Sequence, residues 1–174
     1  MNKIMTIDGR KISKDILEEI KKEVSMLSFV PVFCDVLVGD DIVSKQYVNL
    51  KRKKAESIGI DFYDASFTST ITTEEVISKI HELNKMENMC GIIVQLPLPG
   101  HLDTRRILDA IDPMLDVDCL GTQASDIFYK GDGGMAFPTA LACMRILEEV
   151  KIDLPNSNVV VLGQGELVGR PVSH

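Results

Sequence analysis

The chain has 174 residues, of which 45% are hydrophobic and 26% are charged, and its formal net charge is −7. This composition is typical of a globular protein with one domain, or one domain and part of another, and it excludes a disordered or collagen-like chain. The acidic balance argues against nucleic-acid binding, which usually needs a basic stripe. The sequence has no apolar run near the roughly 18 residues of a membrane span, and its start lacks the apolar core of an export signal. We therefore expect a cytoplasmic protein with no nucleic-acid or membrane partner.

The cysteines and histidines show no pattern typical of a disulfide framework or a metal site. There is no CxxC pair and no HExxH segment. In a chain without an export signal, such cysteines are expected to be reduced core residues. We accordingly expect no metal site.

Helical and strand-like stretches alternate along the first two thirds of the chain, which predicts an α/β fold. Long apolar runs indicate strands buried on both faces of a parallel sheet, and amphipathic spacing indicates helices. The expected strands are 29–39, 60–67 and 91–96. The expected helices are 12–27, 41–58, 73–84 and 104–110.

The last third of the chain is predicted to be less regular. The segment 121–134 is rich in loop residues, and Thr139 is expected to cap a helix that ends at Val150. A turn at 155–157 then leads to an apolar strand over 159–162. This strand runs into a glycine-rich segment.

One face of the helix expected over 41–58 carries a tyrosine and a lysine among apolar residues. Ser44, Tyr47 and Lys51 recur at helical spacing, and Ala55 and Ile58 extend the same stripe. A lysine on an apolar face is partly desolvated, which suits proton transfer near neutral pH. The alternative interpretation is a lysine whose stem covers apolar surface beside a half-buried tyrosine.

Polar residues near two other element ends are further candidates. Gln95 ends an apolar strand, and ligands of open parallel sheets bind outside the carboxyl ends of strands. Gln95 and Lys51 are therefore expected to line one crevice, although the amide of Gln95 could equally satisfy loop carbonyls. Of Asp116 and Asp118, one is expected to cap its loop while the other faces a pocket.

The glycine-rich segment reads GxGxxxG, one residue longer than the usual dinucleotide fingerprint. Because an apolar run precedes it, its amides are candidates for cradling a phosphate. The acidic ribose-binding residue that this fingerprint predicts about 20 positions later would fall beyond residue 174. An ordinary tight turn is the alternative.

Together these segments resemble the bifunctional methylenetetrahydrofolate dehydrogenase/methenyltetrahydrofolate cyclohydrolase family. The resemblance is collinear from about Gly9 onward. It covers VGDD, S-x-x-Y-V-x-x-K, GIIVQLPLPGHLD, DVD, TALACMRIL and VVVLG-x-G-x-x-VGRP. It implies an α/β fold, a three-layer parallel-type sheet with flanking helices, followed by a truncated Rossmann domain. It also implies a folate-binding domain over 1–137, a connecting helix and turn over 138–155, and the start of the NAD(P)-binding domain over 156–174.

The resemblance also implies roles for individual residues. Lys51 matches the catalytic lysine, and Gln95 matches the amide that tunes it. Tyr47 matches the aromatic residue that stacks on the folate, Asp118 matches the carboxylate that binds the pterin, and Ser44 matches a supporting position. Val94 and Leu96 would join them in binding the substrate. The cofactor-binding positions would be Gly163, Gln164 and Gly165.

Several positions depart from the family pattern. Leu115 replaces the usual lysine before DVD, and Cys119 replaces the glycine after it. The bulkier Cys119 is expected to alter the loop backbone and the aim of Asp118. Gln164 and Gly165 stand where many members have arginine or alanine followed by serine, so a preference for NADP over NAD is not expected from this loop.

The resemblance implies an enzyme of one-carbon metabolism. Its full-length members use NADP or NAD to oxidise 5,10-methylenetetrahydrofolate and then hydrolyse the methenyl product to 10-formyltetrahydrofolate. The family further implies a small-molecule folate substrate, with tetrahydrofolate as the carrier, and a homodimer formed through the second domain. The rival interpretation is a non-catalytic folate-binding fragment. A plain interaction module explains none of the residues named above.

Overall fold

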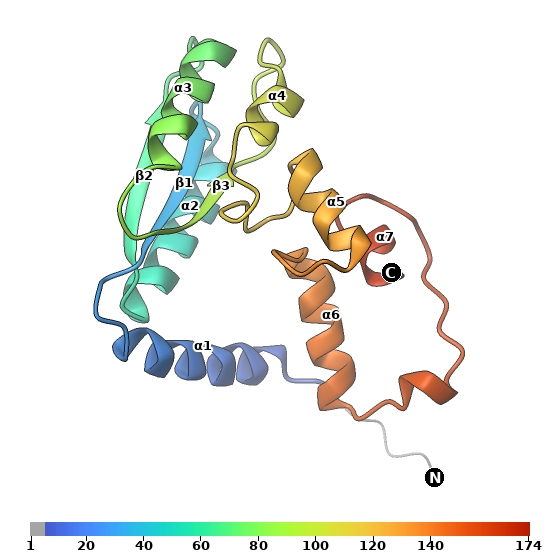
Figure 1. Ribbon diagram of the computed structural model, residues 1–174. Coiled ribbons are helices and arrows are strands. Elements are labelled where there is room, and N and C mark those ends of the chain that lie inside the picture. Colours follow the sequence, from blue (N-terminus) through green and yellow to red (C-terminus); the bar gives the residue numbers. More distant parts are fainter. Residues whose placement is uncertain (1–5) are drawn as a thin grey trace.

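A computed structural model describes residues 6–174 (Figure 1). The strands of this part are β1 (Val32–Val38), β2 (Asp61–Phe67) and β3 (Met89–Val94). Its α-helices are α1 (Gly9–Ser25), α2 (Ile42–Ser57), α3 (Thr73–Leu83), α4 (Thr104–Asp109), α5 (Thr122–Lys130), α6 (Pro138–Glu149) and α7 (Gly169–Val172). A 3-10 helix, η1 (Leu154–Asn156), occupies the turn expected at 155–157.

The three strands form a parallel sheet in the order β2-β1-β3, so β1 is central. In its register Asp35 of β1 lies beside Asp64 of β2 and Ile93 of β3. Helix α2 contacts β1 and β2 on the face of the sheet that carries the Asp35 side chain. Helices α3 and α4 pack on the opposite face, which carries Cys34 and Val36. The three-layer parallel arrangement predicted from the sequence is confirmed.

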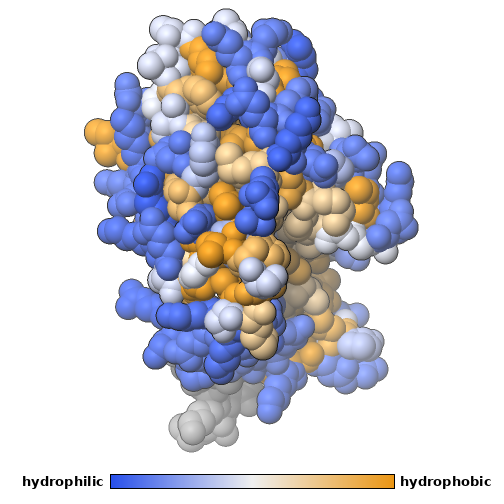
Figure 2. Space-filling view, turned by 60° about the vertical axis from the view of Figure 1, so that its left-hand side comes forward, coloured by the Kyte–Doolittle hydropathy of each residue, from blue (hydrophilic) through white to orange (hydrophobic). Residues whose placement is uncertain are grey.

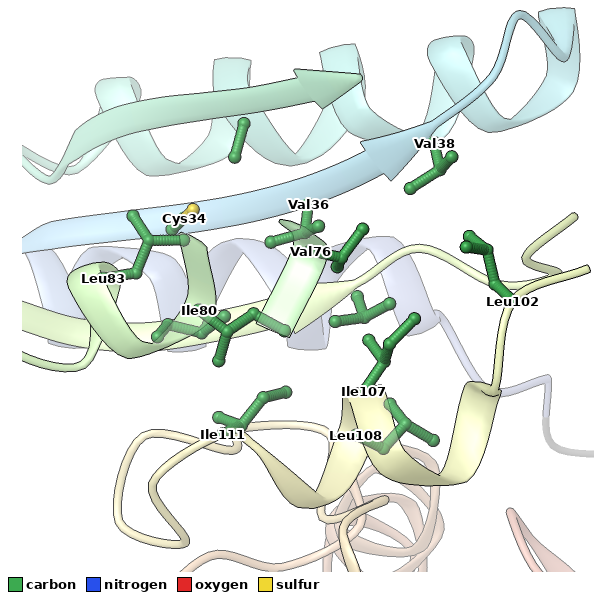
Figure 3. Packing of buried hydrophobic residues seen from close by; sticks show 13 residues of the cluster. Cys34, Val36, Val38, Val76, Ile80, Leu83, Leu102, Ile107, Leu108 and Ile111 are labelled. Carbon is green, nitrogen blue, oxygen red and sulfur yellow. The ribbon is translucent and has the colours of Figure 1, made fainter. Parts of the chain in front are cut away.

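The main hydrophobic core lies between the sheet and the pair α3 and α4 (Figure 3). Alternate residues of β1 point into it, since side chains alternate between the faces of a strand. Its fully buried side chains include Cys34, Val36, Val76, Ile80, Leu83, Ile92 and Ile107. Burying each of the aliphatic ones contributes roughly 1.5–3 kcal/mol. This core fixes the strand ends that carry the candidate site.

Local capping fixes both ends of α2. The Asp41 carboxylate accepts a hydrogen bond from the Ser44 amide at 2.7 Å, which caps the amino-terminal end of the helix. At the other end Gly59 adopts φ +89°, a left-handed conformation that glycine enters at little cost. Helix α2 thus agrees to within a residue at each end with the helix predicted over 41–58, and its position sets Lys51 over the sheet.

The loop-rich prediction for 121–134 is wrong, because α5 occupies most of this segment. The helix ends at Gly131, whose φ of +71° is typical of a glycine that terminates a helix. The prediction for the next helix also needs correction. Phe137, and not Thr139, is its N-cap residue, and Pro138 takes the first helical position, where its missing amide is not needed.

The strand predicted over 159–162 is not formed. A strand needs a neighbour for its amides and carbonyls, and the three-stranded sheet lies elsewhere in the molecule (Figure 1). Val160 is 80% exposed and Leu162 is 94% exposed. The chain loops away from α6 over these residues and returns at α7, which contacts α6.

Hydrophilic side chains cover most of the face shown in Figure 2, with apolar side chains gathered near its middle. Across residues 6–174, none of the helices has the length and apolar character that crossing a membrane would require.

Candidate functional site

Lys51 and Gln95 meet beside the central strand. Helix α2 follows β1 and carries Lys51, while Gln95 directly follows β3. The Lys51 Nζ donates a hydrogen bond to Gln95 Oε1 at 2.9 Å, and Gln95 Nε2 donates to the Leu96 carbonyl at 3.0 Å. The amide thus satisfies a loop carbonyl and contacts the lysine at once. The strand-end argument from the sequence correctly brought these residues together.

A third member of the site, Asp35, was missed by sequence reasoning. Its side chain is fully buried on β1, and its Oδ2 lies 2.5 Å from Lys51 Nζ. The signal was present in the sequence as one acidic residue inside the apolar run FVPVFCDVLVG. An unpaired carboxylate in such a run is costly, so its presence indicates a buried cationic partner.

Burial is the largest influence on Asp35 and raises the pKa of its carboxyl group. The Lys51 ammonium opposes this effect, whereas the negative charge of Asp64 adds to it. Asp64 itself pairs with Arg52, which also lies over the Phe62 ring. Two consecutive basic residues of α2 therefore contact two neighbouring carboxylates of the sheet.

Asp116 and Asp118 lie in two different environments, one inside its loop and the other at the crevice. Asp116 is buried, bridges to Ile92 beside β3 and accepts a hydrogen bond from the Gly121 amide at 2.7 Å. Asp118 lines the crevice next to Lys51. Burial raises the pKa of the Asp118 carboxyl, and the Lys51 charge partly offsets this rise.

Two adjoining cavities of about 540 Å³ and 230 Å³ form the crevice. Both are lined by Ile93, Asp118 and Pro138. Lys51 lines the larger cavity, whose remaining walls are mostly apolar. The smaller cavity is lined by Val94, Gln95, Leu96, Asp118 and Phe137, among others. A largely apolar cleft with a few polar groups is typical of a small-molecule site.

The helix stripe predicted from Ser44 to Ile58 is buried at its two ends but not throughout. Ser44 is buried, as are Ala55 and Ile58, whereas Tyr47 is 58% exposed and does not line either cavity. The expectation that Tyr47 shares one packed face with Ala55 and Ile58 therefore does not hold. Ile42, Val43 and Leu50 of the same helix are exposed as well, whereas Ser44 and Val48 between them are buried.

Gly163 and Gly165 lie in a different cavity from Lys51, although Leu167 of the same glycine-rich segment lines the smaller cavity of the crevice beside Gln95 and Asp118. Gly163 and Gly165 line a cavity of about 880 Å³ beside α6, and Gln164 Oε1 accepts a hydrogen bond from Ser173 at 3.3 Å. Gly163 has φ +99°, and a Cβ on Gly169 would lie 2.1 Å from the Gly163 carbonyl oxygen. The positive φ therefore explains Gly163, and the close backbone contact explains Gly169.

These residues do not by themselves fit a dinucleotide cofactor. The helix that follows the glycines, α7, has four residues, and residues 159–162 join no sheet. A dinucleotide site of this kind needs a strand, a loop and a helix held together. Within residues 6–174, no group of three or more histidine, cysteine, aspartate or glutamate side chains is placed to hold a metal ion.

Comparison with known proteins decides the family. Residues 7–118 match the family model described as "Tetrahydrofolate dehydrogenase/cyclohydrolase, catalytic domain". The chain belongs to this family. Among curated members, it is 40% identical over 172 residues to the bifunctional protein FolD of Nautilia profundicola, covering 97% of this chain and 61% of that protein.

Solved structures of the tetrahydrofolate dehydrogenase/cyclohydrolase family have the same fold. The Campylobacter jejuni FolD enzyme matches 95% of this chain and 60% of its own, with a TM-score of 0.90 and 33% identity. The Trypanosoma brucei FolD enzyme, solved with NADP cofactor and inhibitor, matches 99% of this chain and 60% of its own, with a TM-score of 0.90 and 32% identity. The chain thus spans about three fifths of the relatives it matches.

Proposed function

We propose that this chain is the folate-binding part of a bifunctional methylenetetrahydrofolate dehydrogenase/methenyltetrahydrofolate cyclohydrolase. The observation that carries the proposal is the placement of Lys51 Nζ, 2.9 Å from Gln95 Oε1 and 2.5 Å from Asp35 Oδ2. This ammonium faces a largely apolar crevice of the size expected for a small ligand.

Hydrolysis of the methenyl group requires three proton movements. Water adds to the methenyl carbon and loses one proton; the resulting hydroxyl then loses its second proton to become the formyl oxygen, as the bond from this carbon to the N5 nitrogen opens and N5 gains a proton. Lys51 Nζ is the group in the crevice that would hold or move these protons, and Gln95 Oε1 would orient it. Fixing these groups beside the bound folate lowers the entropic part of the barrier.

The remaining site residues would bind the folate. Asp118 would hydrogen-bond the pterin, and the exposed ring of Tyr47 would stack on the aromatic part of the substrate. Val94 and Leu96 would form the apolar wall of the smaller cavity, and Ser44 would support the start of α2. These roles rest on position in the family pattern together with exposure in the structure.

The dehydrogenase step would need a more complete cofactor site than residues 6–174 provide. We propose a domain order of 1–137 for folate binding, 138–155 for the connection, and 156–174 for the start of the NAD(P)-binding domain. Gly163, Gln164 and Gly165 would form one loop of that domain. We also propose a cytoplasmic homodimer formed through the second domain, as in the family pattern.

The experiment uses this chain completed at its carboxyl end with the remaining part of the N. profundicola relative. Lys51→Gln should lower the rate of methenyltetrahydrofolate hydrolysis by on the order of 100-fold, because a general acid-base group is lost. Lys53→Gln, on an exposed position of the same helix, is the matched control and should leave the rate unchanged. Wild-type hydrolysis by a folded Lys51→Gln protein would contradict the proposal.

A non-catalytic folate-binding role is the second candidate. It is favoured by the four-residue length of α7 and by the lack of a sheet around residues 159–162. Titration of folate into the completed protein, followed by the hydrolysis assay, separates the two. Binding without turnover would favour the second candidate.

A further inference from the structure

Asp35 lies beneath Lys51 at the centre of the sheet, and the proton movements of the proposed hydrolysis do not involve its carboxylate. It is fully buried on the face of β1 that α2 covers. A hydrophobic residue would fill this place at lower cost, because removing a carboxylate from water is unfavourable unless a partner compensates it. The position therefore requires an explanation.

The contacts of Asp35 are directed at one group. Its Oδ2 is 2.5 Å from Lys51 Nζ, and neither carboxylate oxygen accepts a hydrogen bond of ordinary geometry from another group within residues 6–174. The Lys51 side chain reaches inward from α2 and is 26% exposed, so it lies between the sheet and the crevice. The attraction between the two charges is strong in this poorly solvated place.

We propose that Asp35 is a positioning residue for the cyclohydrolase reaction, which anchors the Lys51 ammonium between the sheet and Gln95. The proposal rests on the function proposed above. An ammonium has three hydrogens. One is donated to Gln95 Oε1, and the ion pair with Asp35 holds the ammonium from below, so hydrogens remain for the crevice.

The physical gain is the loss of freedom in a long side chain. A lysine has a flexible four-carbon stem, and holding it in one conformation costs side-chain entropy. Asp35 cannot move, because it lies on a strand inside the sheet. The ion pair therefore orders the Lys51 side chain before substrate binds, so this entropy is not lost during the reaction. Asp35 itself has no exposed surface, so it does not touch the substrate.

The charged groups around Asp35 come from three elements. Helix α2 supplies Lys51, β2 supplies Asp64, and the loop between α4 and α5 supplies Asp118. Asp64 is paired with Arg52 of α2 and so does not compete for the lysine. Asp64 lies beside Asp35 in the sheet register and has the same charge. It is accordingly the matched control position.

The activity test compares Asp35→Asn with Asp64→Asn in the completed enzyme. Asp35→Asn should lower kcat for methenyltetrahydrofolate hydrolysis by on the order of 10- to 100-fold, because a misplaced catalytic group loses its orientation. The KM should change by less than about twofold, since a buried residue makes no ground-state contact with substrate. The pH profile of kcat should also change shape in Asp35→Asn, whereas Asp64→Asn should keep both kcat and profile.

A second readout does not depend on turnover. In the 174-residue chain, nitrogen-15 NMR of the lysine side chains follows exchange of the Lys51 ammonium hydrogens with water. Removing the anchoring charge should speed this exchange by about tenfold or more in Asp35→Asn but not in Asp64→Asn. Should Asp35→Asn fail to fold, Asp35→Val, which suits the apolar strand, replaces it in both measurements.

The two readouts separate the outcomes. An inactive wild-type enzyme would contradict the proposed function. In that case the exchange rate of the Lys51 ammonium hydrogens would still show whether Asp35 holds Lys51. With an active wild type, an unchanged kcat or an unchanged exchange rate in folded Asp35 variants overturns the proposal. Equal losses in the Asp35 and Asp64 variants overturn it as well.

Discussion

The ion pair of Asp35 and Lys51 is uneven, since the carboxylate is fully buried and the ammonium is about one quarter exposed. Replacing Lys51 by methionine leaves a buried charge without a partner. We predict that Lys51→Met lowers the free energy of unfolding at pH 7 by on the order of 3 kcal/mol, which urea denaturation would measure.

A double variant provides the control for this prediction. Asp35→Val removes the stranded charge, so Asp35→Val/Lys51→Met should regain most of the lost stability. If the double variant were as unstable as Lys51→Met alone, the loss would come from packing of the lysine stem and not from the charge.

Asp118 has a raised pKa because it is buried, with Lys51 opposing the rise. A raised pKa means that the native state holds the proton more tightly than the unfolded chain does. The carboxyl therefore favours the native state below its unfolded pKa, and this contribution is lost as pH rises through the raised value. We predict that Asp118→Asn is more stable than the wild type at pH 7 and that the difference shrinks toward about pH 4.

Thermal unfolding at several pH values measures this difference. The exposed Asp132 supplies the comparison, since Asp132→Asn should shift stability by the same small amount at each pH. An Asp118→Asn protein that loses stability at neutral pH would show that the carboxylate is well compensated in the native state.

Cys119 has φ +60°, although it carries a side chain and is fully buried. Left-handed backbone strains a side chain, and a β-branched one most of all. We predict that Cys119→Val lowers the free energy of unfolding by about 2 kcal/mol, whereas Cys119→Gly is better tolerated. Calorimetry on the two variants checks this, and equal effects would mean that packing outweighs backbone strain at this site.

Residue-level prediction from sequence succeeded where a strand end fixes geometry and failed where a tertiary contact does. Lys51 and Gln95 were placed together because both follow parallel strands. Asp35 was not found, since a pattern of apolar residues does not reveal which buried side chain a helix will reach. Tyr47 was misplaced because helical spacing gives the face of a residue but not how far the packed surface extends.

Among the helices, α3 has the most complete local signal. Thr72 Oγ1 accepts a hydrogen bond from the Glu75 amide at 3.3 Å, and Glu75 Oε2 accepts one from the Thr72 amide at 2.8 Å. We predict that Thr72→Ala lowers the free energy of unfolding by about 1 kcal/mol, as loss of a capping side chain usually does. Thr70→Ala is the control, because the Thr70 hydroxyl contacts only the exposed Thr68 hydroxyl in the described part of the chain. Equal unfolding midpoints in the two variants would contradict a role for this cap.

At the scale of elements, the sequence predicted the order from α1 to α4 well. Each of the four helices begins at a residue whose side chain caps it, namely Asp8, Asp41, Thr72 and Asp103. Helix α5 was missed because glycines near its ends suggested a loop, although Gly131 is a helix terminator. The strand over 159–162 was wrongly predicted. Apolar β-branched residues favour an extended backbone, but a strand forms only where a neighbouring strand can pair with it.

For the whole molecule, the incomplete dinucleotide site at the glycine-rich segment has a functional consequence. Dehydrogenation needs a nicotinamide held against the folate, and residues 6–174 hold no complete dinucleotide site. We predict that the 174-residue chain alone gives no NAD- or NADP-dependent oxidation of methylenetetrahydrofolate. Absorbance of the reduced cofactor measures this, with the completed enzyme as the positive control. Turnover by the chain, purified free of host enzyme, would show that the site is complete.

The exposed valines and leucine of 159–162 also bear on how the chain behaves at high concentration. Val159, Val160 and Leu162 are all more than half exposed, and the run contains neither charge nor proline. Such a segment can pair with its copy in another molecule without any prior unfolding. Preparations of this chain would then be lost through self-association that grows with protein concentration, even at temperatures at which the sheet and its core remain intact.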